Sequence, residues 1–62
     1  MEKKTIKQWR DEKGITREAL AAACHVSYHT IANWEKKPSM MSVTNFFHVA
    51  HVLGIKPDEI LV

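Results

Sequence analysis

The stretch Thr16–Lys37, TREALAAACHVSYHTIANWEKK, decides the fold because it holds two short helical patterns placed close together. Thr16 is a suitable N-cap for a helix over 17–24, and Ser27 is a suitable N-cap for the next. The second helix must end before Pro38. Cys24 precedes Ser27 by only three residues, so the two helices must meet at a steep angle. This arrangement presents the start of the second helix outward.

The second helix of this pair has two contrasting faces. At about 100° per residue, Ile31 and Trp34 point to one side, and Glu35 lies at the edge of that side. The opposite arc holds hydrogen-bonding groups and a cation without any acid; its residues are Tyr28, His29, Ala32, Asn33 and Lys36. The simpler interpretation is a solvated surface, which is the commoner fate of polar residues on a short helix.

Helical punctuation continues on both sides of this stretch. Thr5 and Gln8 have the spacing of a capping box, and Gly14 is placed to end the helix that they begin. Ser42 precedes a run of apolar residues at helical spacing, which Gly54 closes. These signals predict one helix before the pair and one after it.

The C-terminal segment predicts a short fifth helix. Pro57 suits a first helical turn, and acidic side chains follow it at the positive end of a helix over 58–61. No segment alternates polar and apolar residues with period two over a useful length. The sequence therefore predicts an all-α fold, a compact bundle of five short helices.

Length and composition indicate one small domain, residues 1–62, near the lower limit for independent folding. A net charge of +2 leans basic, but the distribution of charge is more informative than its sum. The single cysteine excludes an intrachain disulfide and favours a reducing, cytoplasmic location. Neither a signal peptide nor a membrane span is expected.

From Thr5 to Leu61 the chain resembles the lambda-repressor-like helix-turn-helix domains of the phage repressor and Cro type. The resemblance rests on a series of segments in this order: Trp9–Thr16, Leu20-Ala21, Val26-Ser27, Thr30-Ile31, Trp34-Glu35, Ser42-Val43 and Leu53–Ile55. It implies that helices 2 and 3 form the helix-turn-helix and that helix 3 enters the major groove of DNA. It also implies a transcriptional regulator, most naturally a bacterial or phage repressor, that binds specific double-stranded DNA.

The resemblance also assigns DNA contacts. Those that read base edges are Tyr28, His29, Ala32 and Asn33. Those expected at phosphates are Arg17, Ser27, Thr30, Lys36, Lys37, Ser42, Thr44 and Asn45. The alternatives are structural: a lid over the core for Tyr28, a spacer for Ala32, and a solvated helix end for the two lysines.

Two positions depart from the family pattern. Arg17 stands where the family usually has glutamine, and His25 stands in the turn where glycine is favoured. A left-handed backbone at His25 would cost about 1 kcal/mol. The resemblance further implies a partly buried ion pair between Arg10 and Glu35, and we interpret Cys24 as a small core residue, with redox sensing as a minor alternative.

Double-stranded DNA with a near-palindromic site is the expected partner, bound by a homodimer that forms in solution or only on DNA. The candidate dimer seam consists of surplus apolar residues, namely Phe47, Val52, Ile55, Leu61 and Val62. The rival hypothesis is a protein-binding module of the same fold, an antirepressor or antitoxin.

No enzymatic activity and no cofactor are expected, because the chain lacks a Ser/His/Asp series and a glycine-rich phosphate loop. Five residues are possible zinc ligands, namely Cys24, His25, His29, His48 and His51. Their spacing does not match a usual zinc site, so solvated histidines are the better interpretation.

Overall fold

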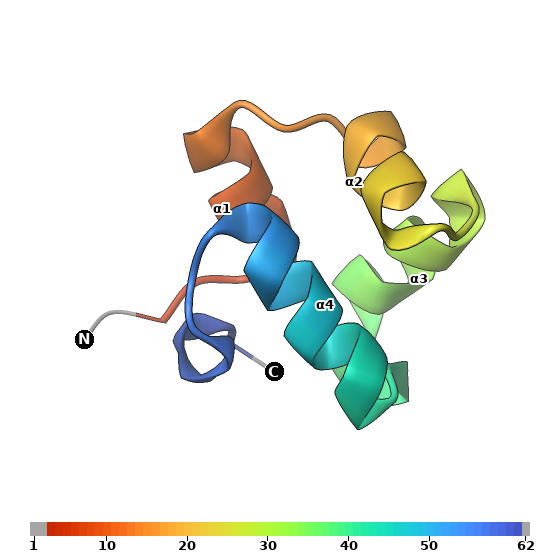
Figure 1. Cartoon of the computed structure of the whole chain (residues 1–62). Coiled ribbons are helices and arrows are strands. Elements are labelled where there is room, and N and C mark those ends of the chain that lie inside the picture. The colour runs from red at the N-terminus through yellow and green to blue at the C-terminus, as the bar shows by residue number, and fades with distance from the viewer. Residues whose placement is uncertain (1–2, 62) are drawn as a thin grey trace.

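The computed structural model describes residues 3–61, which form four α-helices and two single 3-10 turns. The elements follow one another closely along the chain: α1 (Ile6–Lys13), α2 (Arg17–Cys24), α3 (Tyr28–Lys36), the turn η1 (Pro38–Met40), α4 (Val43–Leu53) and the turn η2 (Pro57–Glu59). Figure 1 shows α4 crossing the front of the molecule, with α1 on one side of it and the α2–α3 pair on the other. The expectation of an all-helical domain is confirmed for this range.

Every α-helix between residues 3 and 61 follows an N-cap residue with a hydroxyl side chain. The cap oxygen accepts a hydrogen bond from a backbone amide three residues later, in each of the pairs Thr5–Gln8, Thr16–Ala19, Ser27–Thr30 and Ser42–Asn45. The Gln8 side chain also accepts from the Thr5 amide, which completes the capping box. These bonds satisfy amides that have no partner within the helix, so the helix starts were predictable from local sequence.

Three of the helices end in the same backbone motif. A residue in the left-handed conformation follows α1, α2 and α4, and the next residue donates its amide to a carbonyl five residues earlier, in the pairs Ile15–Arg10, Val26–Ala21 and Ile55–Ala50. This is the Schellman geometry, in which that next residue usually makes a hydrophobic contact. Each of the three is partly buried and packs against the core.

The core draws at least one fully buried side chain from every α-helix and from the C-terminal segment. Its largest members are Ile6, Leu20, Ile31, Val49, Leu53 and Ile60. Trp9 and Trp34 are also buried. Burying each large apolar side chain contributes about 1.5–3 kcal/mol, so α4 stabilises the domain by covering the apolar faces of the other helices.

The prediction of a fifth α-helix over 58–61 is wrong. Pro57 does start a turn, but the turn is a single 3-10 unit that ends at Glu59. The chain is then extended, and Ile60 forms an isolated parallel bridge with Lys4, with the Leu61 amide 2.8 Å from the Lys4 carbonyl oxygen. Four residues are too few to offset the cost of nucleating an α-helix. Pairing with Lys4 instead provides hydrogen-bond partners for the Glu59 carbonyl and the Leu61 amide.

The indole of Trp9 reinforces this junction between the two ends of the chain. Its Nε1 donates to the Glu59 carbonyl oxygen over 2.9 Å. The same carbonyl accepts the Lys4 amide over 3.1 Å. The C-terminal segment is therefore held against α1 by backbone and side-chain bonds together.

None of the helices within residues 3–61 has the length and apolarity needed to cross a bilayer.

His25 occupies the left-handed region, with φ 57°, and it is the one non-glycine residue between positions 3 and 61 with a positive φ. The strain anticipated for this residue is therefore present. Its amide donates to the Ala22 carbonyl oxygen over 3.2 Å, and the residue lies exposed at the turn between α2 and α3.

Replacing His25 with glycine should raise the free energy of unfolding by up to about 1 kcal/mol, because glycine adopts positive φ without the steric penalty. His25→Ala is the matched control, since it removes the imidazole but keeps the Cβ and its strain. Urea unfolding followed by tryptophan fluorescence measures both variants. Equal stabilities for the glycine and alanine variants would show that the backbone of this turn carries no relievable strain.

Candidate nucleic-acid interface

The turn that joins α2 and α3 is short and fixed by backbone hydrogen bonds. The Val26 amide donates to the Ala21 carbonyl oxygen over 3.0 Å, and the side chain of Val26 packs against the core. Ser27 then caps α3 at once. The chain consequently changes direction over the three residues between the helices, which leaves the N-terminal end of α3 projecting from the domain (Figure 1).

The helix α3 divides into the two faces that its sequence predicted. Ile31 and Trp34 are buried against the rest of the domain. The residues assigned to base edges lie on the other side: Tyr28, His29 and Asn33 are exposed, and Ala32 is half-buried. Tyr28 is 43% exposed.

The residues assigned to phosphates come from the start of α2, from both ends of α3 and from the start of α4. Lys36 and Lys37 are exposed at the C-terminal end of α3, and Thr44 is exposed in the first turn of α4 with Asn45 half-buried beside it. The hydroxyls of Ser27 and Thr30 lie 3.0 Å apart at the start of α3. Ser27 and Ser42 both use their oxygen to accept the capping hydrogen bond of a helix, so Ser42 has its hydroxyl hydrogen to offer a phosphate, and Ser27 and Thr30 have one such hydrogen between them.

The anchor of α3 is a buried carboxylate at its C-terminal end. The Glu35 side chain is only 6% exposed, and its Oε2 accepts from Arg10 Nε over 2.8 Å. Arg10 is buried as well, and its Nη1 donates to the Ile15 carbonyl oxygen over 3.1 Å. The ion pair expected between Arg10 and Glu35 is thus present, and it ties α3 to α1.

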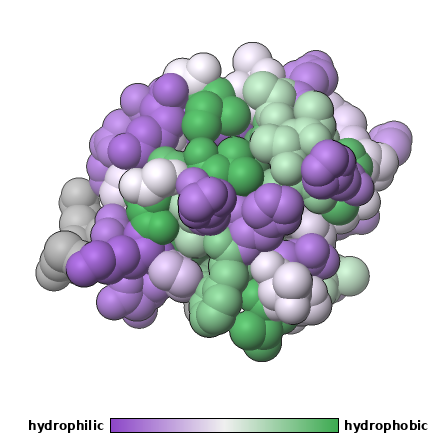
Figure 2. Space-filling view, in the orientation of Figure 1, coloured by the Kyte–Doolittle hydropathy of each residue, from purple (hydrophilic) through white to green (hydrophobic). Residues whose placement is uncertain are grey.

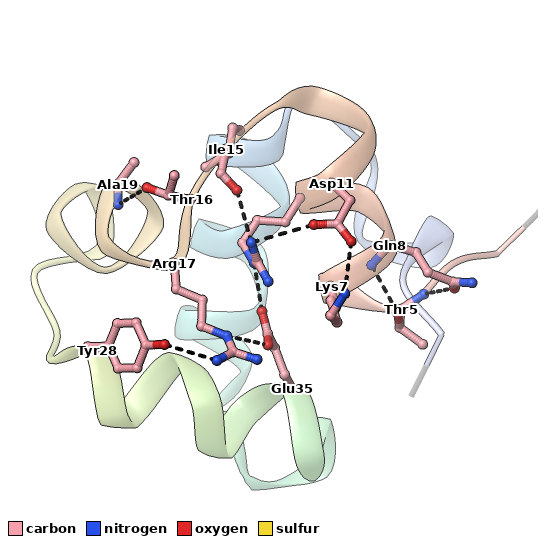
Figure 3. Close-up of polar contacts among 11 residues, drawn as sticks. Thr5, Lys7, Gln8, Asp11, Ile15, Thr16, Arg17, Ala19, Tyr28 and Glu35 are labelled. Atoms are coloured by element: carbon pink, nitrogen blue, oxygen red, sulfur yellow. Dashed lines mark hydrogen bonds and ion pairs between the residues drawn. The ribbon is translucent and has the colours of Figure 1, made fainter.

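A second guanidinium binds the same carboxylate, which sequence reasoning missed. Arg17 Nε donates to Glu35 Oε1 over 2.8 Å, and Arg17 Nη1 donates to the Tyr28 hydroxyl over 3.0 Å. These two hydrogen bonds raise the pKa of Arg17 above its ordinary value, and the bond to Tyr28 has the larger effect. Figure 3 shows Arg17 extending from the start of α2 between Tyr28 and Glu35. The signal available in the sequence was the extra positive charge at a position where the family usually has glutamine.

The candidate dimer seam does not form one surface. Phe47 and Val52 lie five residues apart, or about 140° around α4, so they face opposite flanks of the helix. Val52 and Ile55 pack against the core, and Ile55 does so as the hydrophobic contact of the α4 terminus. Phe47 and Leu61 remain exposed. Val62 lies outside the described residues.

In the view of Figure 1, the space-filling surface shows hydrophobic patches over α4 that hydrophilic residues interrupt (Figure 2). The most exposed large apolar side chains on or beside α4 are Met40, Val43 and Phe47. Val43 and Phe47 are one turn apart and share a flank of the helix.

Cys24 is a buried core residue, and burial raises the pKa of its thiol. A thiol with a raised pKa is less often a reactive thiolate. Within residues 3–61, no three histidine, cysteine or acidic side chains are grouped as ligands for a metal ion.

A family model described as helix-turn-helix matches residues 6–60 of the chain, which is nearly its whole length. The chain belongs to the helix-turn-helix family. This match confirms the resemblance to the lambda-repressor and Cro type, a family of DNA-binding regulators. No curated protein and no solved structure matches the chain significantly.

Replacing Glu35 with methionine should lower the free energy of unfolding by about 3 kcal/mol, because it leaves the buried guanidinium of Arg10 without its carboxylate. Arg10→Met should cost less, since Glu35 keeps Arg17 as a partner. The double variant Arg10→Met/Glu35→Met should recover much of the loss by removing both buried charges. Thermal and urea unfolding of the three variants provide the comparison.

An additive double variant would contradict this account of the ion pair. An Arg10→Met variant as unstable as Glu35→Met would show that Arg17 does not compensate at the shared carboxylate.

Proposed function

We propose that this protein is a transcriptional regulator that binds specific double-stranded DNA by inserting α3 into the major groove. One observation carries the proposal: the projecting arc of α3 presents hydrogen-bonding side chains and a lysine with no acid, while its only carboxylate is buried and paired with two arginines. Membership in a helix-turn-helix family supports the same function.

The proposed base contacts follow from the chemistry of the exposed arc. Asn33 can pair with adenine through two hydrogen bonds, and His29 can donate to or accept from a purine edge. Tyr28 lies at the N-terminal end of α3, which in this family lies deepest among the base edges. Ala32 is small enough to contact a thymine methyl group.

The proposed phosphate contacts surround this arc and supply affinity without sequence information. Lys36 and Lys37 extend from the end of α3, and the side chains of Ser42, Thr44 and Asn45 extend from the start of α4. Ser27 and Thr30 share one hydrogen bond between their hydroxyls, which leaves one hydroxyl hydrogen of the pair for a phosphate at the start of α3. Arg17 uses two of the five N–H groups of its guanidinium within the protein, so N–H donors remain for a phosphate.

Selection from a random DNA pool should yield a defined site, and on that site His29→Ala and Asn33→Ala should each weaken binding by about 1–3 kcal/mol. The same variants should bind random DNA as the parent does. Lys36→Ala is the matched control, and it should weaken binding to both DNAs. It should also make the negative slope of log affinity against log salt concentration less steep by about 0.9. Gel shifts at several salt concentrations measure all three. Equal losses on selected and random DNA for His29→Ala and Asn33→Ala would refute base reading.

We further propose that the protein acts as a repressor that occupies a near-palindromic operator as a homodimer. One recognition helix reads too few base pairs to be specific against a genome of competing sites, and dimers of this family bind half-sites about one helical turn apart. Of the five seam candidates, Phe47 and Leu61 offer exposed apolar surface. Such a seam is small, which favours dimerisation on DNA over dimerisation in solution.

Leu61→Lys should reduce cooperative binding to the two-half-site operator while leaving binding to an isolated half-site intact, because Leu61 is exposed and its replacement spares the core. Gel-shift titration together with analytical ultracentrifugation follows both species. A single 1:1 complex on every selected site, already in the parent protein, would defeat the dimer model.

A protein-binding role as an antirepressor or antitoxin is the second candidate, and the observation that favours it is the pair of exposed apolar side chains, Val43 and Phe47, on one flank of α4. Apolar side chains grouped on a surface often mark a protein interface. A stable complex with another protein, combined with no affinity for any selected DNA, would establish this function instead.

A further inference from the structure

The contact between Arg17 and Tyr28 fixes more than the position of the tyrosine ring. Arg17 is itself held in place, because its Nε donates to the Glu35 carboxylate, whose side chain is 6% exposed. From this anchored position, Arg17 Nη1 reaches the Tyr28 hydroxyl over 3.0 Å. Figure 3 shows the three side chains in one line, from Glu35 through Arg17 to Tyr28.

The direction of this hydrogen bond is determined by chemistry. A guanidinium has five N–H donors and no acceptor, so the phenol oxygen of Tyr28 must accept. The hydroxyl hydrogen of Tyr28 then points away from Arg17, and no acceptor for it is present elsewhere in residues 3–61. The adjacent positive charge polarises the phenol, which makes its O–H a stronger donor.

The ring of Tyr28 is also held from the side. His29 packs against it edge to face, with ring centroids 6.3 Å apart and an interplanar angle of 87°. The Arg17 guanidinium carbon lies 5.7 Å from the ring centroid. The tyrosine therefore presents an outward O–H from the first residue of α3, where 43% of the residue is exposed.

We propose that Arg17 is a positioning residue that fixes Tyr28 as a hydrogen-bond donor to an acceptor atom on a DNA base. This inference rests on the proposed function, in which the N-terminal end of α3 meets the base edges. The acceptors in the major groove are purine N7, guanine O6 and thymine O4, whereas adenine and cytosine present amino groups at the matching places. A free phenol bonds to either kind, whereas a phenol whose oxygen already accepts from Arg17 has its hydrogen left to offer and therefore prefers an acceptor.

The test measures the affinity of the protein for variants of the selected operator. Each variant carries one of two kinds of base change at a single position. Exchanging guanine for adenine, or thymine for cytosine, replaces a carbonyl acceptor by an amino group, and 7-deazapurines remove N7. One operator position should hold the base that accepts from Tyr28. Removing the acceptor at that position should lower the affinity of the parent protein about five- to tenfold, as expected for one hydrogen bond to a base. Tyr28→Phe should show no loss from that same change, because it lacks the hydroxyl and keeps the ring.

Arg17→Gln is the decisive variant, with Arg17→Met beside it. Glutamine has an amide oxygen as well as an amide N–H₂, so it no longer forces Tyr28 to be a donor. Both variants should lose most of the acceptor preference at the Tyr28-dependent position and retain the base preferences that depend on His29 and Asn33. Heteronuclear NMR spectra of the free variants confirm that α3 is intact.

The inference is overturned if Tyr28→Phe remains sensitive to every base change, or if Arg17→Gln keeps the full preference for an acceptor. It is also overturned if Tyr28→Phe is instead coupled to methylphosphonate substitution, since the acceptor would then be a phosphate oxygen. A parent protein that selects no sequence would refute the proposed function and this inference together. Specific binding that depends on His29 and Asn33 but not on Tyr28 would refute the inference alone.

Discussion

One buried carboxylate determines how the outer face of this domain is arranged. Glu35 accepts a hydrogen bond from Arg10 on α1 through one oxygen and from Arg17 on α2 through the other, each over 2.8 Å. A single acid at the end of α3 thereby links three helices. Because an isolated buried charge is costly, the buried Arg10 and Glu35 require each other, and the links to α1 and α2 restrict rotation of α3 about its own axis.

The orientation of α3 in turn decides which side chains project. With Glu35 paired inside, Ile31 and Trp34 cover the core, and the opposite arc carries no uncompensated acid. Arg17 extends the same network to Tyr28 at the other end of the helix. The ion network and the proposed DNA-binding face therefore lie on opposite sides of one helix. A change in the ion network should alter the orientation of the side chains on the DNA-binding face.

Much of this fold is visible in the sequence, because local rules determine it. The caps Thr5, Thr16, Ser27 and Ser42 mark each helix start, and the positive φ of His25 follows from its place in the turn. The features that escaped prediction depend on contacts distant in sequence. Ile60 pairs with Lys4 instead of continuing a helix, and Arg17 meets Tyr28 only because the turn folds α3 back beside α2. The exposed face of α3 was predictable from the sequence. The hydrogen bond that the Tyr28 hydroxyl accepts from Arg17 was not.

The most direct test of the account is an NMR titration of the labelled protein with the selected duplex, following backbone amides and side-chain signals. If α3 binds DNA, the largest chemical-shift changes occur over residues 27–33, continue through Lys36 and Lys37, and reach the first turn of α4 at Thr44. The end of α4 and the segment from Lys56 to Leu61 should change only where two copies meet. Changes centred on Phe47 and Leu61, with α3 unaffected, would contradict the claim that α3 is the surface that binds DNA.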